Sequence, residues 1–281
     1  MVLNNGKIAA WLGALAEAGI ESIRIGTKEM AFYPQRFDRT FFDMLDRFHE
    51  TYPQVGLHMM LHFEHPDEIL AKGPDGEYIR DEQGFLQWIP ATGEAMRGFA
   101  KRGWITVENQ APIIRGINDD PDALRILQRE FKRAGGENHY FFCGRDIVAY
   151  KAFNIPIEKA WQILNESQKG LSGIEKHARL SITHYKGKTE VAAVTNEPIP
   201  GLKGSENGVV IFKILRNAGR APDAGKVCIV GRNPDALWFD DYEDRVLFDE
   251  AGLFDYTRVS KPGEAPTRMA NSMPMTGGCG G

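Results

Sequence analysis

Four apolar, strand-like segments separated by helical segments occupy the first 170 residues, and this alternation constrains the fold more than any other feature. The strand-like segments are residues 22–27, 55–63, 104–109 and 138–144. Strands that alternate with helices pair in parallel, because each helix returns the chain to the start of the next strand. The pattern predicts an α/β fold with a parallel sheet, either open and doubly wound or a (β/α) barrel.

Helical periodicity fills the gaps between these strands. The helical segments are residues 6–18, 40–50, 92–102, 120–134 and 156–168. In the first of them Trp11, Leu12 and Leu15 recur at helical spacing, which predicts that they share its buried face. The Gly- and charge-rich residues 71–91 break the rhythm and predict a surface insertion.

After residue 170 the pattern changes to strands without intervening helices. Residues 179–194 predict a β-ribbon that turns at Lys186-Gly187-Lys188. Residues 208–215 and 226–231 predict further strands. We expect three parts, namely a (β/α) domain at 1–170, a β-rich extension at 171–260 and a flexible tail at 261–281.

The composition argues against several classes of partner. The net charge is −4 and the two signs are well mixed, so nothing predicts binding to nucleic acid. No apolar run approaches the roughly 20 residues that span a bilayer, and residues 1–13 lack the pattern of a signal peptide. Three cysteines, at 143, 228 and 279, are too sparse for a disulfide scaffold. We expect a cytoplasmic protein that acts on a small molecule.

Polar residues gather where the predicted strands end. His62 follows the core of the second strand, Asn109 and Gln110 end the third, and Asp146 follows the fourth. In both candidate architectures, ligands bind at the carboxyl ends of the strands. Burying polar groups costs free energy unless something bonds to them. We therefore expect these residues, together with Arg115, to face a small-molecule ligand.

His58, His62 and His65 have the spacing of zinc ligands on a helix. On a strand, however, His58 and His62 would lie about 13 Å apart, which one metal ion cannot bridge. A core histidine followed by histidines at the sheet edge is therefore favoured, and no metal site is expected. A hydrolytic barrel with His58, His62 and Asp146 around a metal ion stays an alternative.

Cys143 and Lys188 each allow a catalytic and a structural interpretation. A thiol beside Arg145 could be an activated nucleophile, but a cysteine that follows two phenylalanines is more often buried. A lysine at the glycine turn, Lys186 or Lys188, could form a Schiff base with an aldehyde cofactor. A surface hairpin lysine is the commoner arrangement.

Four longer segments stand out when they are taken in order. They are IRIGT at 23–27 with PQR at 34–36, LHFEHPDEI at 61–69, NQAPIIRGIND at 109–119 and HYFFCGRD at 139–146. Together they resemble the lysine 2,3-aminomutase-like branch of the radical S-adenosylmethionine (SAM) enzymes, over residues 5–192. The resemblance implies an incomplete TIM barrel of about four βα units that holds a [4Fe–4S] cluster and SAM.

The resemblance also implies radical chemistry on an amino acid-like substrate. In this family the cluster reduces SAM, the 5′-deoxyadenosyl radical removes a substrate hydrogen, and pyridoxal phosphate on a lysine carries the amino group between adjacent carbons. The matching positions assign cofactor binding to His62, Asn109, Gln110, Arg115 and Lys188, and catalysis to Asp146 and Lys188. Thr183-His184-Tyr185 replaces the acidic start of the family's lysine segment, which disfavours a basic substrate.

Two parts of the family pattern do not occur in the chain, namely CxxxCxxC and Gly-Gly-Asp. We therefore expect the C-terminal portion of a radical SAM isomerase that does not cleave SAM by itself. It would be a gene fragment, one subunit of a two-chain enzyme or a degenerate relative. Its partner would be the missing N-terminal half or a second copy in a homo-oligomer. A non-enzymatic binding or assembly module is the alternative.

Overall fold

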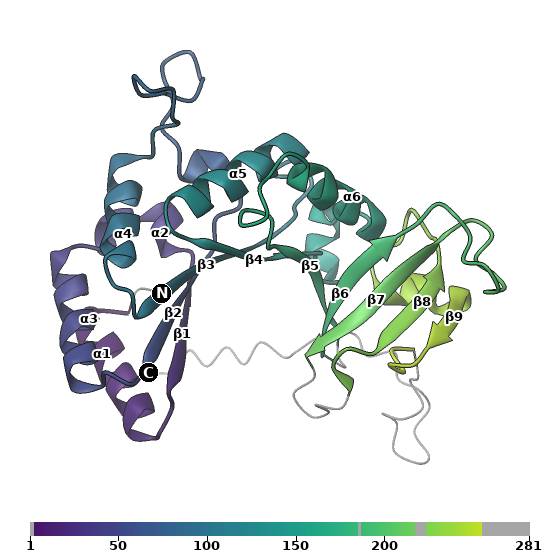
Figure 1. Ribbon diagram of the computed structural model, residues 1–281, viewed down its shortest axis with the longest axis horizontal. Coiled ribbons are helices and arrows are strands. Elements are labelled where there is room, and N and C mark those ends of the chain that lie inside the picture. Colours follow the sequence, from purple (N-terminus) through teal and green to yellow (C-terminus); the bar gives the residue numbers. More distant parts are fainter. Residues whose placement is uncertain (1–2, 185–186, 217–222, 255–281) are drawn as a thin grey trace. The chain divides into compact units, whose positions relative to one another are not determined.

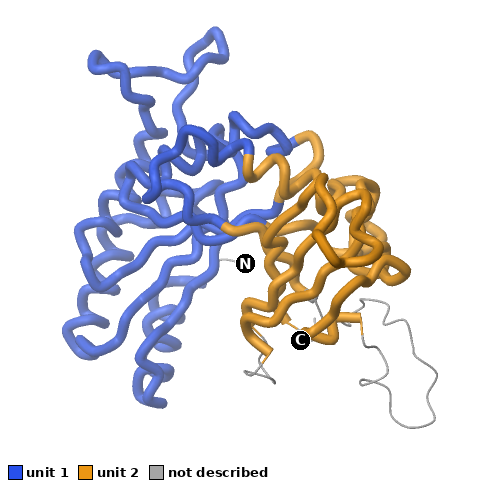
Figure 2. The backbone as a smooth tube through the Cα atoms, turned by 45° about the vertical axis from the view of Figure 1, so that its right-hand side comes forward, with its two compact units in different colours: residues 1–112, 117–141, 166–178 blue, residues 113–116, 142–165, 179–281 orange. Residues whose placement is uncertain are grey.

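The computed structural model describes residues 3–184, 187–216 and 223–254. The chain forms two compact units, which Figure 2 draws in separate colours. Unit 1 comprises residues 1–112, 117–141 and 166–178, and unit 2 comprises residues 113–116, 142–165 and 179–281. The expected hairpin residues 185–186 and the expected tail at 261–281 lie outside the described residues. The division at residues 170 and 260 stays a prediction.

Unit 1 alternates helices and strands, as the pattern predicts (Figure 1). Its elements are α1 (Asn5–Glu17), β1 (Ser22–Thr27), α2 (Glu29–Phe32), η1 (Pro34–Arg36), α3 (Arg39–Thr51), β2 (Gly56–Leu61), η2 (Pro66–Glu68), α4 (Pro90–Ala100), β3 (Ile105–Pro112), α5 (Pro121–Arg133) and β4 (Glu137–Phe142), of which Phe142 belongs to unit 2. β1, β2 and β3 pair in parallel, with Ile25 opposite Met59 and Met59 opposite Val107. The predicted α/β class is confirmed, and the partial barrel stays a prediction.

The first three strands of unit 1 bury one of their two faces in an apolar core. Ile23, Leu57 and Val107 are buried, and the side chains that follow them point to the other face because a strand alternates. α3 and α4 add aromatic rings, with the Phe42 and Phe99 centroids 5.0 Å apart. Burying one such ring stabilises the fold by about 1.5–3 kcal/mol. The other sheet face is mixed, since it carries the buried Met60 beside the polar His58 and Glu108.

The buried face of α1 differs from the prediction. Leu12 and Ala16 are buried, whereas Trp11 is 62% and Leu15 is 41% exposed. The helix lies against α3, since the Tyr52 hydroxyl donates to Glu17 at 3.1 Å. The prediction that Trp11 and Leu15 are buried is wrong. The small Ala16 faces inward instead, so the apolar stripe is wider than the surface that α3 covers.

The expected surface insertion between β2 and α4 projects away from the rest of unit 1 (Figure 1). Its two sides are joined by isolated antiparallel bridges, such as Leu70 with Trp88 and Arg80 with Leu86. At its base the Tyr78 hydroxyl donates to Asp67 at 2.6 Å, and this bond ties the insertion to η2. None of the described helices is long and apolar enough to cross a membrane.

Unit 2 is built on antiparallel strands. Its elements are η3 (Val148–Phe153), most of α6 (Ile157–Gln168), β5 (Arg179–His184), β6 (Gly187–Val194), β7 (Val209–Arg216), β8 (Val227–Gly231), η5 (Phe239–Arg245) and β9 (Val246–Asp249). Each strand from β5 to β9 pairs with the next, and the strand order follows the chain order. Phe212 packs on Phe239, with ring centroids 4.9 Å apart, at the centre of this unit's core.

Candidate functional site

Asn109 joins the ends of β2 and β3 in unit 1. Its Oδ1 accepts a hydrogen bond from the Phe63 N–H at 2.8 Å, and its Nδ2 donates to the Phe63 carbonyl at 3.0 Å. Asn109 is 2% exposed, so both halves of its carboxamide are satisfied inside the protein. In the register of β2 and β3, Leu61 lies opposite Asn109. The Asn109 side chain therefore continues the pairing of the two strands beyond Leu61. It thereby fixes the backbone on either side of Phe63, between His62 and Glu64.

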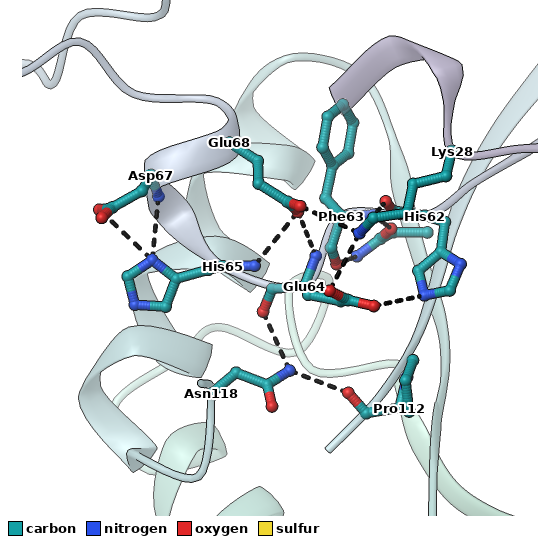
Figure 3. A network of polar contacts seen from close by, with 10 residues as sticks. Lys28, His62, Phe63, Glu64, His65, Asp67, Glu68, Pro112 and Asn118 are labelled. Atoms are coloured by element: carbon teal, nitrogen blue, oxygen red, sulfur yellow. Dashed lines mark hydrogen bonds and ion pairs between the residues drawn. The ribbon is translucent and has the colours of Figure 1, made fainter. Parts of the chain in front are cut away.

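Lys28 and two glutamates form an ion-pair network just beyond the strand ends (Figure 3). Lys28 Nζ lies 3.0 Å from Glu64 Oε2 and 3.0 Å from Glu68 Oε1. The other Glu68 oxygen accepts the Glu64 N–H at 2.5 Å and the His65 N–H at 3.4 Å. Glu68 therefore caps the turn that follows β2, and Lys28 pairs with both carboxylates.

His62 lies at the edge of this network and is partly exposed. Its Nε2 is 3.1 Å from Glu64 Oε1 (Figure 3). The hydrogen bond from His62 is the main cause that lowers the pKa of Glu64, and Lys28 adds to it against the opposing effect of burial. Glu64 is thus a carboxylate at neutral pH, with the His62 ring beside it. A neutral histidine ring carries one donor nitrogen and one acceptor nitrogen.

Asn118 ties the second and third motif segments together a second time. Its Nδ2 donates to the Glu64 carbonyl at 3.0 Å and to the Pro112 carbonyl at 2.9 Å (Figure 3). Asn118 is fully buried. The segments LHFEHPDEI and NQAPIIRGIND are therefore joined twice, by Asn109 to Phe63 and by Asn118 to Glu64. Sequence reasoning missed Asn118, although it lies within a quoted motif.

Gln110 follows Asn109 on β3 and therefore points to the opposite face of the sheet. It is half-buried, and among the described residues no group bonds to its carboxamide. Since Leu61 is opposite Asn109, the next residues on the two strands are His62 and Gln110. Both lie at the carboxyl edge of the sheet, where parallel sheets bind ligands.

Arg115 and Asp146 belong to unit 2. Arg115 donates from Nε and Nη2 to the Asn154 carbonyl at 3.1 and 2.8 Å. Asn154 in turn donates to the Arg145 carbonyl at 2.9 Å, and a Cβ at Gly144 would come within 1.9 Å of its side chain. Arg115 therefore supports the loop that carries Asp146. This loop holds its acidic group at the surface.

The Asp146 carboxylate pairs with the Lys151 ammonium at 3.0 Å. The hydrogen bond to Asp146 raises the pKa of Lys151. Both side chains are partly exposed, so the pair is open to solvent and readily exchanged for a ligand group. Asp146 can therefore turn to a cation on a substrate at little cost.

Lys188 lies near the start of β6, and its Nζ is 4.8 Å from the centre of the Phe142 ring. The side chain is half-buried, and Gly187 before it adopts a φ of +143°, which few other residues tolerate. Lys186 lies outside the described residues. An aromatic face beside a lysine amine is suited to a planar cofactor as well as to an ammonium.

Cys143 is buried, as predicted, and burial raises the pKa of its thiol to about 12. Burial also raises the pKa of the Cys228 thiol. Neither cysteine is a thiolate at neutral pH, so neither is an activated nucleophile. Within the part of the chain that the structure describes, no three His, Cys, Asp or Glu side chains are grouped to hold a metal ion.

The structure thus gathers the predicted site residues into two groups. His62, Asn109 and Gln110 lie at the strand ends of unit 1, whereas Arg115, Asp146 and Lys188 lie in unit 2. Within unit 1 the arrangement is that of a ligand-binding edge of an α/β sheet, with its backbone fixed by buried asparagines. The class of protein defined here is an α/β protein with a polar strand-end site.

Comparison with known proteins adds the family. No protein-family model matches the chain. The chain is 29% identical over 256 residues to "Putative L-lysine 2,3-aminomutase" of Aquifex aeolicus, covering 90% of this chain and 60% of that protein. It is 25% identical over 155 residues to glutamate 2,3-aminomutase of Clostridioides difficile, covering 55% of this chain and 31% of that protein.

A third relative is L-lysine 2,3-aminomutase of Fusobacterium nucleatum, 23% identical over 154 residues, 55% of this chain and 30% of that protein. The chain is thus a homologue of the lysine 2,3-aminomutase-like proteins, and the predicted resemblance is confirmed. It spans about 60% of the length of the first of these relatives.

Proposed function

We propose that this chain forms the SAM-facing and substrate-facing portion of an aminomutase-type radical SAM enzyme. The observation that carries the proposal is the pair of buried asparagines, Asn109 and Asn118, that join the two most specific motif segments. They hold His62 and Gln110 at the carboxyl edge of the unit 1 sheet. The substrate would be amino acid-like, as the names of the relatives suggest.

The residues present do not fit a [4Fe–4S] cluster. Such a cluster needs several thiolates close together. Cys143 and Cys228 are buried thiols with raised pKa values, and Cys279 lies outside the described residues. The described cysteines therefore do not ligate a cluster, and cluster thiolates would have to come from another polypeptide segment.

SAM fits the polar edge of unit 1 better. When bound and reduced, SAM supplies a 5′-deoxyadenosyl radical. Gln110 offers both a donor and an acceptor to such a ligand, and the partly exposed His62 ring offers a second polar group beside it. These residues would orient the ligand. The hydrogen bonds of Asn109 and Asn118 to backbone groups would keep that orientation fixed.

Pyridoxal phosphate fits one feature of unit 2, the half-buried Lys188 amine against the Phe142 ring. When bound, this cofactor supplies the group that carries nitrogen between adjacent carbons. Lys188 would hold it covalently, and Phe142 would cover one side of its ring. Asp146, in the same unit, would bind a cationic group of the substrate in place of Lys151.

The proposal is tested by the binding of SAM to the purified chain, measured by titration calorimetry. We expect Gln110→Ala to weaken binding about tenfold, because the loss of one or two hydrogen bonds costs about 1–2 kcal/mol. Gln83→Ala, on the exposed insertion, is the matched control and should bind like the parent chain. Equal affinity of Gln110→Ala and the parent chain would contradict the assignment.

Two further measurements test the cofactors. After anaerobic iron–sulfur reconstitution, this chain alone should show no stoichiometric [4Fe–4S] absorbance or electron spin resonance signal. A full cluster signal would overturn the argument from the cysteines. Pyridoxal phosphate should give a visible absorbance that Lys188→Ala abolishes and Lys186→Ala retains, and retention in Lys188→Ala would refute the choice of lysine.

A further inference from the structure

The loop that leaves β2 is held in place from two sides. The two buried asparagines of the site bond the backbone groups of Phe63 and Glu64 from the side of β3. On the side of β1, the Lys28 Nζ lies 3.5 Å from the carbonyl of His62, the residue that precedes them. A single lysine therefore does for the β1 side of the loop what two carboxamides do for the β3 side.

Lys28 directs its ammonium group at this loop. It follows Thr27, the last residue of β1, and its side chain is 24% exposed. An ammonium has three N–H donors. Beside the His62 carbonyl, its acceptors are Glu64 Oε2 and Glu68 Oε1, each at 3.0 Å (Figure 3). Among the described residues, no other lysine or arginine lies within 4.0 Å of either carboxylate, so no second cation takes the place of Lys28.

The two carboxylates differ in how firmly they are held. Glu68 Oε2 accepts the N–H groups of Glu64 and His65, at 2.5 and 3.4 Å, so the backbone fixes its position. The Glu64 carboxylate contacts side chains instead, with Oε2 on Lys28 and Oε1 3.1 Å from His62 Nε2. Lys28 adds to the hydrogen bond from His62 in lowering the pKa of Glu64 against the effect of burial. Without the ammonium, like charges would push the Glu64 side chain away from Glu68, and its contact with His62 would be lost.

We propose that Lys28 is a positioning residue, which acts through Glu64 to orient the His62 ring for the ligand at the carboxyl edge of the sheet. The inference rests on the proposed function, in which His62 and Gln110 contact that ligand. Lys28 keeps the Glu64 carboxylate in place, and this carboxylate limits the rotation of the His62 ring. A ring that is oriented before the ligand arrives loses less conformational freedom on binding, which strengthens the complex. Lys28 itself contacts no ligand in this assignment.

The test is titration calorimetry of the whole chain with SAM. Lys28→Met removes the ammonium and keeps an unbranched side chain. We expect this variant to bind SAM about tenfold more weakly, because the ligand must then order the His62 ring itself. Lys132→Met is the matched control, since Lys132 is 21% exposed, lies in the same unit and pairs with Glu137. It should bind SAM like the parent chain.

Aminoethylation restores the charge to a variant that lacks it. Lys28→Cys treated with 2-bromoethylamine regains an ammonium at the length of a lysine side chain. Cys143 and Cys228 are buried in the native chain and should not react, and the parent chain treated in the same way controls for Cys279. Treated Lys28→Cys should bind SAM within about threefold of the treated parent, since the ring is again ordered in advance. Equal SAM affinity of Lys28→Met and the parent chain, or no recovery after aminoethylation, would overturn the inference.

The titration of Glu64, followed by carbon-13 nuclear magnetic resonance, gives a readout that does not depend on SAM. In Lys28→Met the pKa of Glu64 should rise and the His62 ring signals should shift, whereas Lys132→Met should change neither. Unchanged Glu64 and His62 signals in Lys28→Met would refute this inference alone. If these signals change as expected but the parent chain does not bind SAM, the proposed function is refuted, while the action of Lys28 on His62 through Glu64 stands.

Discussion

Replacing Asn109 by alanine should destabilise unit 1 more than a typical surface substitution does. The substitution removes the side chain that bonds the Phe63 N–H and the Phe63 carbonyl, at 2.8 and 3.0 Å. Both groups are buried with Phe63, which is fully inaccessible. A buried backbone group left without a partner costs about 1–3 kcal/mol. Two such groups, with partial relaxation, predict a loss of about 3 kcal/mol in the free energy of unfolding.

The loss is measured by urea unfolding followed by circular dichroism. A change of about 3 kcal/mol corresponds to a fall in melting temperature of about 6–12 °C for a protein of this size class. Asn165→Ala is the matched control, because its carboxamide donates to the Trp161 carbonyl on the exposed side of α6. We expect this control to lose less than about 0.5 kcal/mol.

Hydrogen exchange at the Phe63 amide gives a local measure of the same bond. In the parent chain this N–H donates to Asn109 and should be strongly protected. In Asn109→Ala it should exchange far faster, while the amide of Val107, within β3, keeps its protection. If the unfolding free energy of Asn109→Ala falls by no more than that of Asn165→Ala, the argument that Asn109 holds the strand ends is wrong.

Three further predictions concern titration, reactivity and packing. The hydrogen bond from His139 lowers the pKa of Glu108 below its ordinary value of 4.5, so this carboxylate stabilises the fold above that pH and ceases to do so as the pH falls further. Urea unfolding at pH 7 and pH 3 should therefore show a smaller acid loss in Glu108→Gln than in the parent, and an equal loss would contradict it. Cys143 is buried and its thiol has a pKa of about 12, so it should resist iodoacetamide at pH 8 until the protein unfolds. Labelling is measured by mass spectrometry, and labelling of Cys143 in the native chain would refute its burial. Gly144→Ala should destabilise unit 2 by about 1–3 kcal/mol, because its Cβ would lie 1.9 Å from the Asn154 side chain, and unchanged urea unfolding would show that the loop yields.

The alternation of helices and strands was predictable because it depends on local periodicity. The predicted helix at 120–134 begins at Pro121, since the carboxylate of Asp120 accepts the Asp122 N–H. The apolar face of α1 was not predictable, because Trp11 and Leu15 share the helical spacing but only the shape of α3 decides which side is covered. Periodicity fixes a stripe, and tertiary packing selects the part of it that is buried.

The placement of Asn109 and Gln110 at the end of a strand was predictable, but the contacts of the candidate site residues were not. Asn109 and Gln110 are adjacent in sequence, yet a strand sends them to opposite faces, so Asn109 bonds backbone and Gln110 reaches the polar edge. Arg115 supports the Asn154 backbone, which no spacing indicates. Contact of Gln110 or Arg115 with a cofactor stays a prediction.

The residues that fix the strand ends and the residue that would contact a ligand there perform different tasks. Asn109, Asn118 and Glu68 bond mainly to backbone groups, so they specify the shape of the strand ends whichever ligand binds there. Gln110 differs, because among the described residues no group bonds to its half-buried carboxamide. Replacing Gln110 should therefore weaken ligand binding with little loss of stability. Removing Asn109 should lower stability first and should affect binding only through the displaced strand ends.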